Sequence, residues 1–276
     1  MGVCDSIPGI SGGTIAFITG IYERLINAIK GFSPELLLGM LALLTGKGDK
    51  KKFREDLKKT DLSFLIPLVL GILIALFLFS RVMSYLLENH FSYIMAFFVG
   101  LILASAKTIF SHIEKHHSHN VFLMLIGLAL GISLAFLVPT SINPSYVYVL
   151  FGGFLAICAM ILPGISGAFI LLIMGLYQFV LGLIKDFPAR VEYLLVFGIG
   201  AILGFFTISR AVSWLFKKDK SKTLYFLLGL VVGGLSVPLK GIFSEISLNG
   251  FAITIHICLF IIGAVAAHLI EKIAKK

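Results

Sequence analysis

Residues 8–32 read PGISGGTIAFITGIYERLINAIKGF, and residues 163–187 read PGISGAFILLIMGLYQFVLGLIKDF. Aligned without gaps, the two segments are identical at 12 of 25 positions, including the whole Pro-Gly-Ile-Ser-Gly block. A second match follows each copy, because residues 71–86 and 200–215 share 6 of 16 positions, among them a Ser-Arg pair. Two ordered blocks that share Pro, Ser and Arg indicate a tandem duplication of the chain.

The composition indicates that lipid, rather than water, surrounds most of the side chains. The 276 residues are 58% hydrophobic and only 13% charged, and the mean hydropathy is +1.03. A soluble domain of this length carries far more charge on its surface. A bilayer core about 30 Å thick requires about 20 apolar residues for each helical crossing. Six stretches meet this requirement: 62–87, 91–111, 120–138, 191–216, 223–243 and 251–271.

The basic residues predict how these crossings are oriented. The net charge of +9 could suggest nucleic acid, but most Lys and Arg residues gather in short runs between apolar stretches, at 47–59, 217–222 and 272–276. This is the pattern that the positive-inside bias produces. When 47–59 is placed in the cytoplasm, the other two runs also fall there, so we expect a cytoplasmic C-terminus. We expect membrane lipids, and no nucleic acid, as partners.

Two further apolar stretches, 5–32 and 145–185, are interrupted by Pro and Gly. The second has about 40 residues, which is too long for one crossing and suits two half-helices that turn back. The first has only seven residues before Pro8. We therefore expect either an internal start at Met1 or a truncated first hairpin.

Under this topology helix 62–87 runs outward, whereas its repeat partner 191–216 runs inward. We therefore expect an all-α polytopic membrane protein made of two inverted-topology repeats, 1–138 and 139–276. Each repeat has a re-entrant broken-helix hairpin and about three transmembrane helices. Inverted repeats with discontinuous helices are a recurrent transporter architecture.

The repeated motif predicts an anion site. Backbone breaks at membrane depth occur only where they are buried in protein or line a cavity. Proline suits the first helical turn, and glycine lets the backbone approach a ligand. Each motif then continues as a helix whose N-terminus presents free N–H groups and a positive dipole end. The candidate substrate-binding residues are Pro8, Gly9, Ser11, Gly12, Gly13, Thr14, Pro163, Gly164, Ser166 and Gly167. The simpler alternative is a tight turn in which the serine only caps the helix.

Several charged residues lie in or beside the apolar segments. Arg81 and Arg210 are repeat-related and lie toward the ends of their helices. They either extend to the headgroup region or bind a phosphate through the planar guanidinium. Asp5, Glu23 and Arg24 are candidates for coupling transport to an ion, because a carboxylate here could carry a proton. The alternative is that this carboxylate only forms an ion pair with Arg24.

We expect no metal and no cofactor. The cysteines, which lie in apolar segments without metal-ligand spacing, are expected to be packing residues: Cys4, Cys158 and Cys258. His112 and His116 have a spacing that could bind a metal, but beside Lys115 a solvated turn is favoured. The segment 34–46 is too short to span the bilayer and is expected to lie at the interface.

The motifs also carry a family resemblance. Residues 4–14 (CDSIPGISGGT) followed by 20–23 (GIYE), together with the second motif at 161–175, resemble the bacterial polyprenyl-phosphate transporter family of the PopT type, formerly a domain of unknown function. The resemblance covers essentially the whole chain. It implies flipping of undecaprenyl phosphate from the outer to the inner leaflet of the bacterial cytoplasmic membrane, which recycles the lipid carrier of cell-wall synthesis. It also implies a polyprenyl-phosphate lipid partner. We expect alternating access around a central phosphate site near Ser11 and Ser166, and no catalytic residues.

Two other function classes remain as alternatives. One is an integral membrane undecaprenyl pyrophosphate phosphatase, a family that also has inverted repeats and a Pro-Gly-x-Ser motif. In that family the serine is followed by Arg and Ser, whereas here Ser11 precedes Gly12-Gly13 and Ser166 precedes Gly167-Ala168. The other is a carrier or channel for a small anion or ion. The sequence makes no prediction of oligomeric state or coupling ion.

Overall fold

The computed structural model describes residues 1–5, 11–45, 49–111, 113, 116–137, 144–185, 188, 190–245 and 250–274. Within these residues all regular structure is helical. The helices are α1 (Gly2–Asp5), α2 (Gly12–Ile18), α3 (Tyr22–Gly31), α4 (Pro34–Leu44), α5 (Lys50–Lys58), α6 (Leu62–Asn89), α7 (Phe91–Ser111), α8 (Ser118–Ser133), η1 (Leu134–Phe136), α9 (Tyr146–Ile161), α10 (Gly167–Ile173), α11 (Tyr177–Lys185), α12 (Val191–Lys218), α13 (Lys220–Gly234), α14 (Ser236–Glu245) and α15 (Gly250–Ala274).

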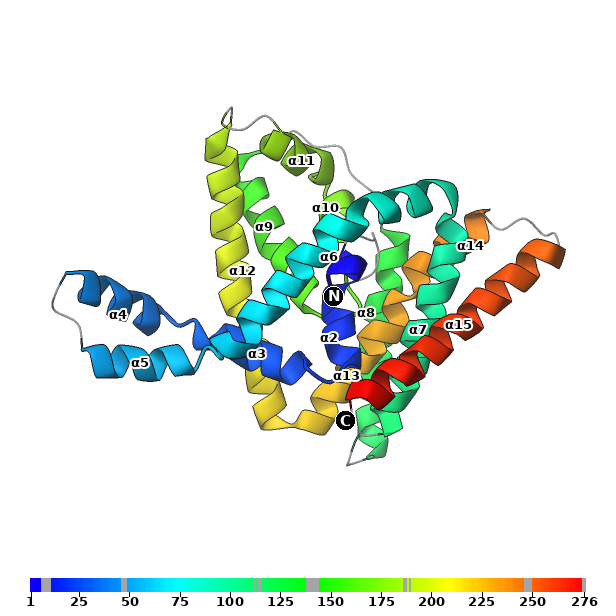
Figure 1. Ribbon diagram of the computed structural model, residues 1–276, viewed down its shortest axis with the longest axis horizontal. Coiled ribbons are helices and arrows are strands. Elements are labelled where there is room, and N and C mark those ends of the chain that lie inside the picture. The colour runs from blue at the N-terminus through cyan, green and yellow to red at the C-terminus, as the bar shows by residue number, and fades with distance from the viewer. Residues whose placement is uncertain are drawn as a thin grey trace.

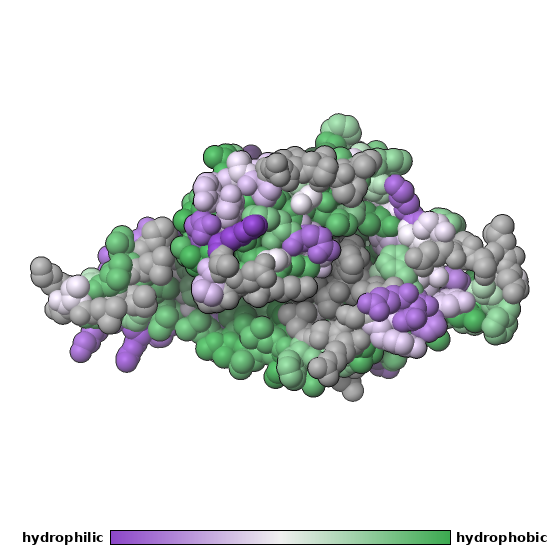
Figure 2. Space-filling view, turned by 90° about the horizontal axis from the view of Figure 1, so that it is seen from above, coloured by the Kyte–Doolittle hydropathy of each residue, from purple (hydrophilic) through white to green (hydrophobic). Residues whose placement is uncertain are grey.

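Six helical segments of the described chain are long and apolar enough to cross a membrane. They match the six predicted stretches, so the prediction of an all-α polytopic membrane protein is confirmed. One difference concerns the predicted span 223–243, which is divided at Leu235 into α13 and α14. Apolar side chains are exposed at several places around the edge of the view in Figure 2, and Phe77 on α6 is 84% exposed. Exposed apolar residues on this scale fit a lipid environment.

The two halves contain elements of matching length and backbone conformation. The helices α6 and α12 each have 28 residues. Each is preceded by a non-glycine residue with positive φ, Asp61 at 45° and Arg190 at 99°. The helices α2 and α10 each have 7 residues and are followed by a glycine with positive φ, Gly20 and Gly175. Because glycine has no Cβ, it takes this left-handed conformation at little cost.

The halves interlock through their later helices. Helix α15 of the second half packs along α7 of the first half, and α8 of the first half packs along α13 of the second half. Glycines lie where these helices cross. A Cβ at Gly229 would lie 2.0 Å from the Met124 carbonyl oxygen, and one at Gly263 would lie 2.0 Å from that of Phe97. Small residues at such crossings let helix backbones approach closely, which is how membrane helices gain packing energy.

The connections divide between two ends of the molecule (Figure 1). The α12–α13 turn and the C-terminal ends of α7 and α15 lie at one end, while the α6–α7 turn and the N-terminal end of α12 lie at the other. The α4–α5 hairpin projects sideways from the bundle. The interfacial position expected for 34–46, whose helix α4 has 11 residues, stays a prediction.

Candidate functional site

The two copies of the repeated motif meet inside the bundle. The backbone N–H of Gly164 donates a hydrogen bond of 2.8 Å to Thr14 Oγ1, across 150 residues of sequence. A Cβ at Gly13 would lie 2.8 Å from the Ile161 carbonyl oxygen, which precedes the second motif. Pro163 is fully buried, whereas Pro8 and Gly9 lie outside the described residues. The fold therefore places α2 directly against the second motif.

The two repeated serines cap the helices that follow them. Ser11 Oγ accepts a hydrogen bond of 3.1 Å from Gly13 N and donates one of 3.2 Å to the Met160 carbonyl. Ser166 Oγ accepts a longer bond of 3.4 Å from Phe169 N. Both serines are buried, as is Thr14 at 2% exposure. The capping that the simpler alternative expects is present, and the Ser11 hydroxyl also joins the two motifs.

Glycines of the second motif pack against other backbones. Gly164 has φ of +89°, and a Cβ there would lie 2.4 Å from the Leu230 carbonyl oxygen on α13. A Cβ at Gly167 would lie 2.5 Å from the carbonyl oxygen of Ala156 on α9. The glycine of α13 that faces this turn is Gly234, whose added Cβ would lie 2.0 Å from the Gly164 carbonyl oxygen. In the first motif Gly12 and Gly13 are also buried.

The second broken segment folds back on itself. The hydroxyl of Tyr148, near the start of α9, donates a hydrogen bond of 3.0 Å to the carbonyl of Met174, just after the end of α10. Thus α9 leads into the Pro163 turn and α10 returns along α9. In the first half α1 packs against α6, as α9 packs against α12 in the second half. Insertion of these hairpins into a bilayer stays a prediction.

Arg210 belongs to a cluster of cations on α12 and α3. Its Nη1 donates to the Phe206 carbonyl at 3.1 Å, and its guanidinium lies 5.1 Å from the centre of the Phe206 ring. Burial, and then the nearby charges of Lys217 and Arg210, hold the pKa of Lys30 below its usual value. Arg81 lies in α6, but its side chain is outside the described part of the structure. Arg210 thus contacts Phe206 on its own helix, and its charge acts on Lys30 of α3.

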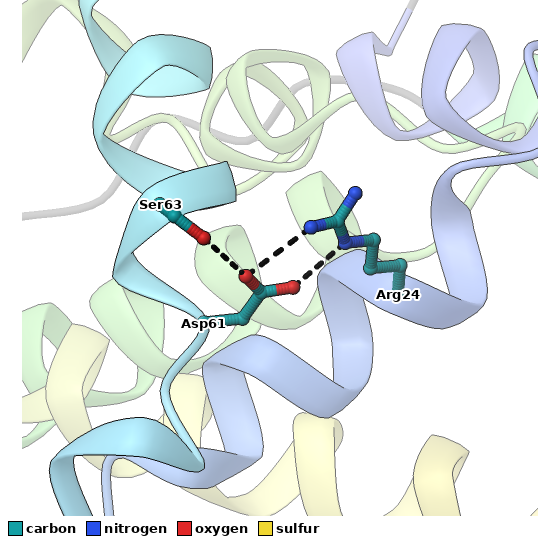
Figure 3. A network of polar contacts seen from close by, with 3 residues as sticks. All are labelled: Arg24, Asp61 and Ser63. Atoms are coloured by element: carbon teal, nitrogen blue, oxygen red, sulfur yellow. Dashed lines mark hydrogen bonds and ion pairs between the residues drawn. The ribbon is translucent and has the colours of Figure 1, made fainter.

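The coupling candidates Glu23 and Arg24 form ion pairs with other helices. Glu23 Oε2 lies 2.7 Å from Lys220 Nζ. Arg24 donates from Nε and Nη2 to the two carboxylate oxygens of Asp61, at 2.7 and 3.2 Å, and Ser63 bonds the same carboxylate (Figure 3). The hydrogen bond from Arg24 is the main cause that lowers the pKa of Asp61. Asp5 lies in α1, and its side chain is not among those described.

Comparison with known proteins identifies the family. A family model described as VCA0040-like, undecaprenyl phosphate translocase-like, matches residues 1–250. The chain belongs to this translocase-like family. The family resemblance noted from the motifs is therefore confirmed.

Two relatives of this translocase-like chain carry the name polyprenyl-phosphate transporter. The one from Vibrio cholerae serotype O1 is 40% identical over 235 residues, which cover 85% of this chain and 73% of the relative. The one from Staphylococcus aureus is 29% identical over 282 residues, which cover 95% and 91% of the two chains. No solved structure matches the chain.

In this member of the translocase-like family, tertiary contacts add partners that the motifs did not reveal. Asp61 was missed as the partner of Arg24, although an acidic residue at the start of a predicted span was visible in the sequence. His116 Nδ1 lies 2.7 Å from the buried hydroxyl of Tyr225, so the predicted solvated turn is tied to α13. His112 is outside the described residues, and those described include no cluster of three metal ligands.

Proposed function

We propose that this chain translocates undecaprenyl phosphate from the outer to the inner leaflet of the bacterial cytoplasmic membrane, with its C-terminus in the cytoplasm. The family model and both relatives are named for this class of transport. The single structural observation that carries the proposal is the contact between α2, which follows the first PGISG copy, and the second copy. Thr14 and Gly164 are joined by a 2.8 Å hydrogen bond within a bundle of six candidate membrane spans.

The phosphate site is proposed at these paired turns. Buried hydroxyls of Ser11, Thr14 and Ser166 gather there, and two helices begin there. A phosphate monoester accepts hydrogen bonds from hydroxyl and backbone N–H donors. The N–H groups of Gly13 and Gly164 bond to Ser11 and Thr14 here, so the phosphate would replace these hydroxyls as their acceptor. The apolar prenyl chain has no need to enter the polar site and stays beside the bundle. Arg81 and Arg210 remain proposed phosphate contacts, and Asp5, Glu23 and Arg24 remain proposed coupling residues.

The proposed mechanism is alternating access between two inverted repeats, 1–138 and 139–276. Three features support it: α6 and α12 have equal length, each follows a residue with positive φ, and α8 and α15 each pack against a helix of the other half. When one repeat rocks against the other, contacts that join them must open and close. The Ser11–Met160 and Thr14–Gly164 hydrogen bonds join the repeats at the proposed site. They are therefore the bonds that the transition is expected to break.

The proposal favours transport over hydrolysis. The family is named as a translocase, and the PGISG serines are followed by Gly12 and Gly167 rather than by the Arg expected of a pyrophosphate phosphatase. Release of inorganic phosphate from undecaprenyl pyrophosphate by the purified protein would support the enzyme instead. Flux of a soluble anion into vesicles that lack polyprenyl lipid would support the small-anion carrier.

A leaflet-resolved assay of undecaprenyl phosphate in proteoliposomes tests the function. We expect Ser11→Ala and Ser166→Ala each to lower the translocation rate at least tenfold, which corresponds to about 1.4 kcal/mol in the barrier. Because both serines also cap helices, Ser145→Ala is the matched control: Ser145 Oγ caps α9 by accepting from Tyr148 N. Wild-type rates in both motif variants would remove the site assignment, and equal losses in all three variants would reduce it to helix capping.

A further inference from the structure

A cleft opens between α12 and α13, with α8 behind it. Its volume is about 640 Å³, within the range of about 300–1,000 Å³ typical of pockets for small molecules. The sides are apolar and include Ile208, Ala211 and Leu215 on α12, and Phe226 on α13. We call it the lysine-rimmed cleft because Lys218 and Lys222 also line it. Both faces that form it belong to candidate membrane spans.

The inner part of this cleft reaches the second motif. Leu162, which immediately precedes Pro163, is one of its lining residues. Val212 and Leu227, which also line it, are buried in the same apolar cluster against which Leu162 packs. A molecule lying along the cleft would therefore touch the residue that leads into the PGISG turn.

The outer part of the cleft carries cations, and one of them contacts an aromatic residue that lies outside the lining. Lys218 Nζ lies 4.7 Å from the centre of the Trp214 ring, and Trp214 is 56% exposed. Exposed tryptophan is typical of the membrane–water interface. Asp219 is the acidic residue of the rim, but its carboxylate caps α13 through Lys222 N and also pairs with Lys222 Nζ at 3.2 Å. Two lysines against one carboxylate leave the rim net positive.

We propose that the lysine-rimmed cleft docks one polyprenyl-phosphate molecule, with the prenyl chain between α12 and α13 and the phosphate against Lys218 and Lys222. Apolar sides, a cationic rim and an interfacial tryptophan complement a lipid with a long apolar chain and an anionic head. The cleft places such a lipid in the leaflet beside the α12–α13 turn. The inner end of the cleft is lined by Leu162, the residue immediately before the second motif. The proposal rests on the proposed function and adds the place where the lipid binds before or after translocation.

Photolabelling in proteoliposomes tests the docking. The probe is a prenyl phosphate with a diazirine on its chain, and labelled peptides are mapped by mass spectrometry. We expect label on residues 208–227 and a loss of at least fivefold in Ala211→Trp, whose larger side chain fills the cleft. Ala129→Trp is the matched control, because Ala129 is an exposed alanine on α8 that does not line the cleft. Label confined to other helices, or equal label in both tryptophan variants, would overturn the proposal.

The head-group contact is tested by competition and by charge removal. Undecaprenyl phosphate should displace the probe, whereas undecaprenol of the same length and inorganic phosphate should each require at least tenfold higher concentration. Lys218→Gln with Lys222→Gln should weaken labelling at least fivefold, whereas Lys51→Gln with Lys52→Gln on α5 removes the same charge and should not. Equal competition by undecaprenol would show an unspecific lipid groove, and equal competition by inorganic phosphate a free-anion site; either result overturns the proposal.

The two proposals fail separately. If the protein labels in the cleft but does not translocate the lipid, the proposed function fails and the docking site stands. If Ala211→Trp folds and translocates at the wild-type rate while label appears elsewhere, the docking site fails and the function stands.

Discussion

The hydrogen bond between the two motifs can be removed with almost no change of shape. Thr14→Val replaces the hydroxyl by a methyl group, so Gly164 N–H loses the acceptor at 2.8 Å. Thr14→Ser keeps the acceptor and removes only the methyl group. Thr14 is buried, and its surroundings are protein, so water cannot readily replace the lost acceptor.

The expected cost follows from this geometry. Leaving a buried donor without a partner costs about 1–3 kcal/mol. Gly164 is only half-buried, so we expect the lower part of that range, about 1–2 kcal/mol. At about 2–4 °C per kcal/mol for a chain of this size, Thr14→Val should unfold about 2–8 °C below the wild type. Thr14→Ser should lie closer to the wild type.

Thermal unfolding in detergent, followed by far-UV circular dichroism, measures the difference. A leaflet-resolved assay on the same variants should show a slower rate for Thr14→Val, because the Thr14 hydroxyl is also part of the proposed phosphate site. If Thr14→Val and Thr14→Ser unfold at the same temperature and translocate equally, this bond has no role in joining the motifs.

Two further predictions concern the packing of the second motif and the surface ion pair. Gly164→Ala should destabilise the protein by about 1–3 kcal/mol, because alanine is strained at this positive φ and its Cβ meets the Leu230 carbonyl. The control is Gly182→Ala, because a Cβ at Gly182 has no atom within 4 Å. Equal melting temperatures of the two variants would refute the inference that Gly164 packs against Leu230. Arg24→Gln should lower the unfolding temperature at neutral pH. Arg24 lowers the pKa of Asp61, so the stabilisation is complete above the ordinary aspartate pKa of about 3.9 and is lost as pH falls through the lower folded value. Melting curves at several pH values measure the difference in melting temperature between the wild type and Arg24→Gln. If this difference disappeared between about pH 6 and 7, where histidine titrates, the assignment to Asp61 would be contradicted.

Much of the fold could be predicted from the sequence because membrane spans are recognisable by length and apolarity alone. The six predicted stretches match the six candidate spans, and α6 begins at the predicted residue, Leu62. The division of the predicted span 223–243 at Leu235 was not predicted, although the sequence carries its local cause: Pro238 has no N–H to donate to the Gly234 carbonyl four residues earlier. What the sequence does not show is that Gly233 and Gly234 bring α13 close to Gly131 on α8 and Gly164 of the second motif.

Part of the candidate site could be proposed from the sequence. The identical PGISG blocks single out Ser11 and Ser166, Thr14 follows the first block, and all three side chains are buried. Their hydrogen-bond partners could not be predicted, because Met160 and Gly164 lie about 150 residues away in sequence. The sequence also could not show that Gly164 packs against Leu230 rather than a ligand. Either role requires a residue without a side chain.

The sequence by itself determined that this chain is helical, crosses a membrane and contains two copies of one motif, because each of these properties is local and leaves a run or a repeat of residues. Only the tertiary structure decided which helices exchange between the halves, that Asp61 pairs with Arg24, and that a lysine-rimmed cleft leads to the second motif. Those features depend on side chains that meet across long separations, and no local pattern of hydrophobicity or charge records which ones will meet.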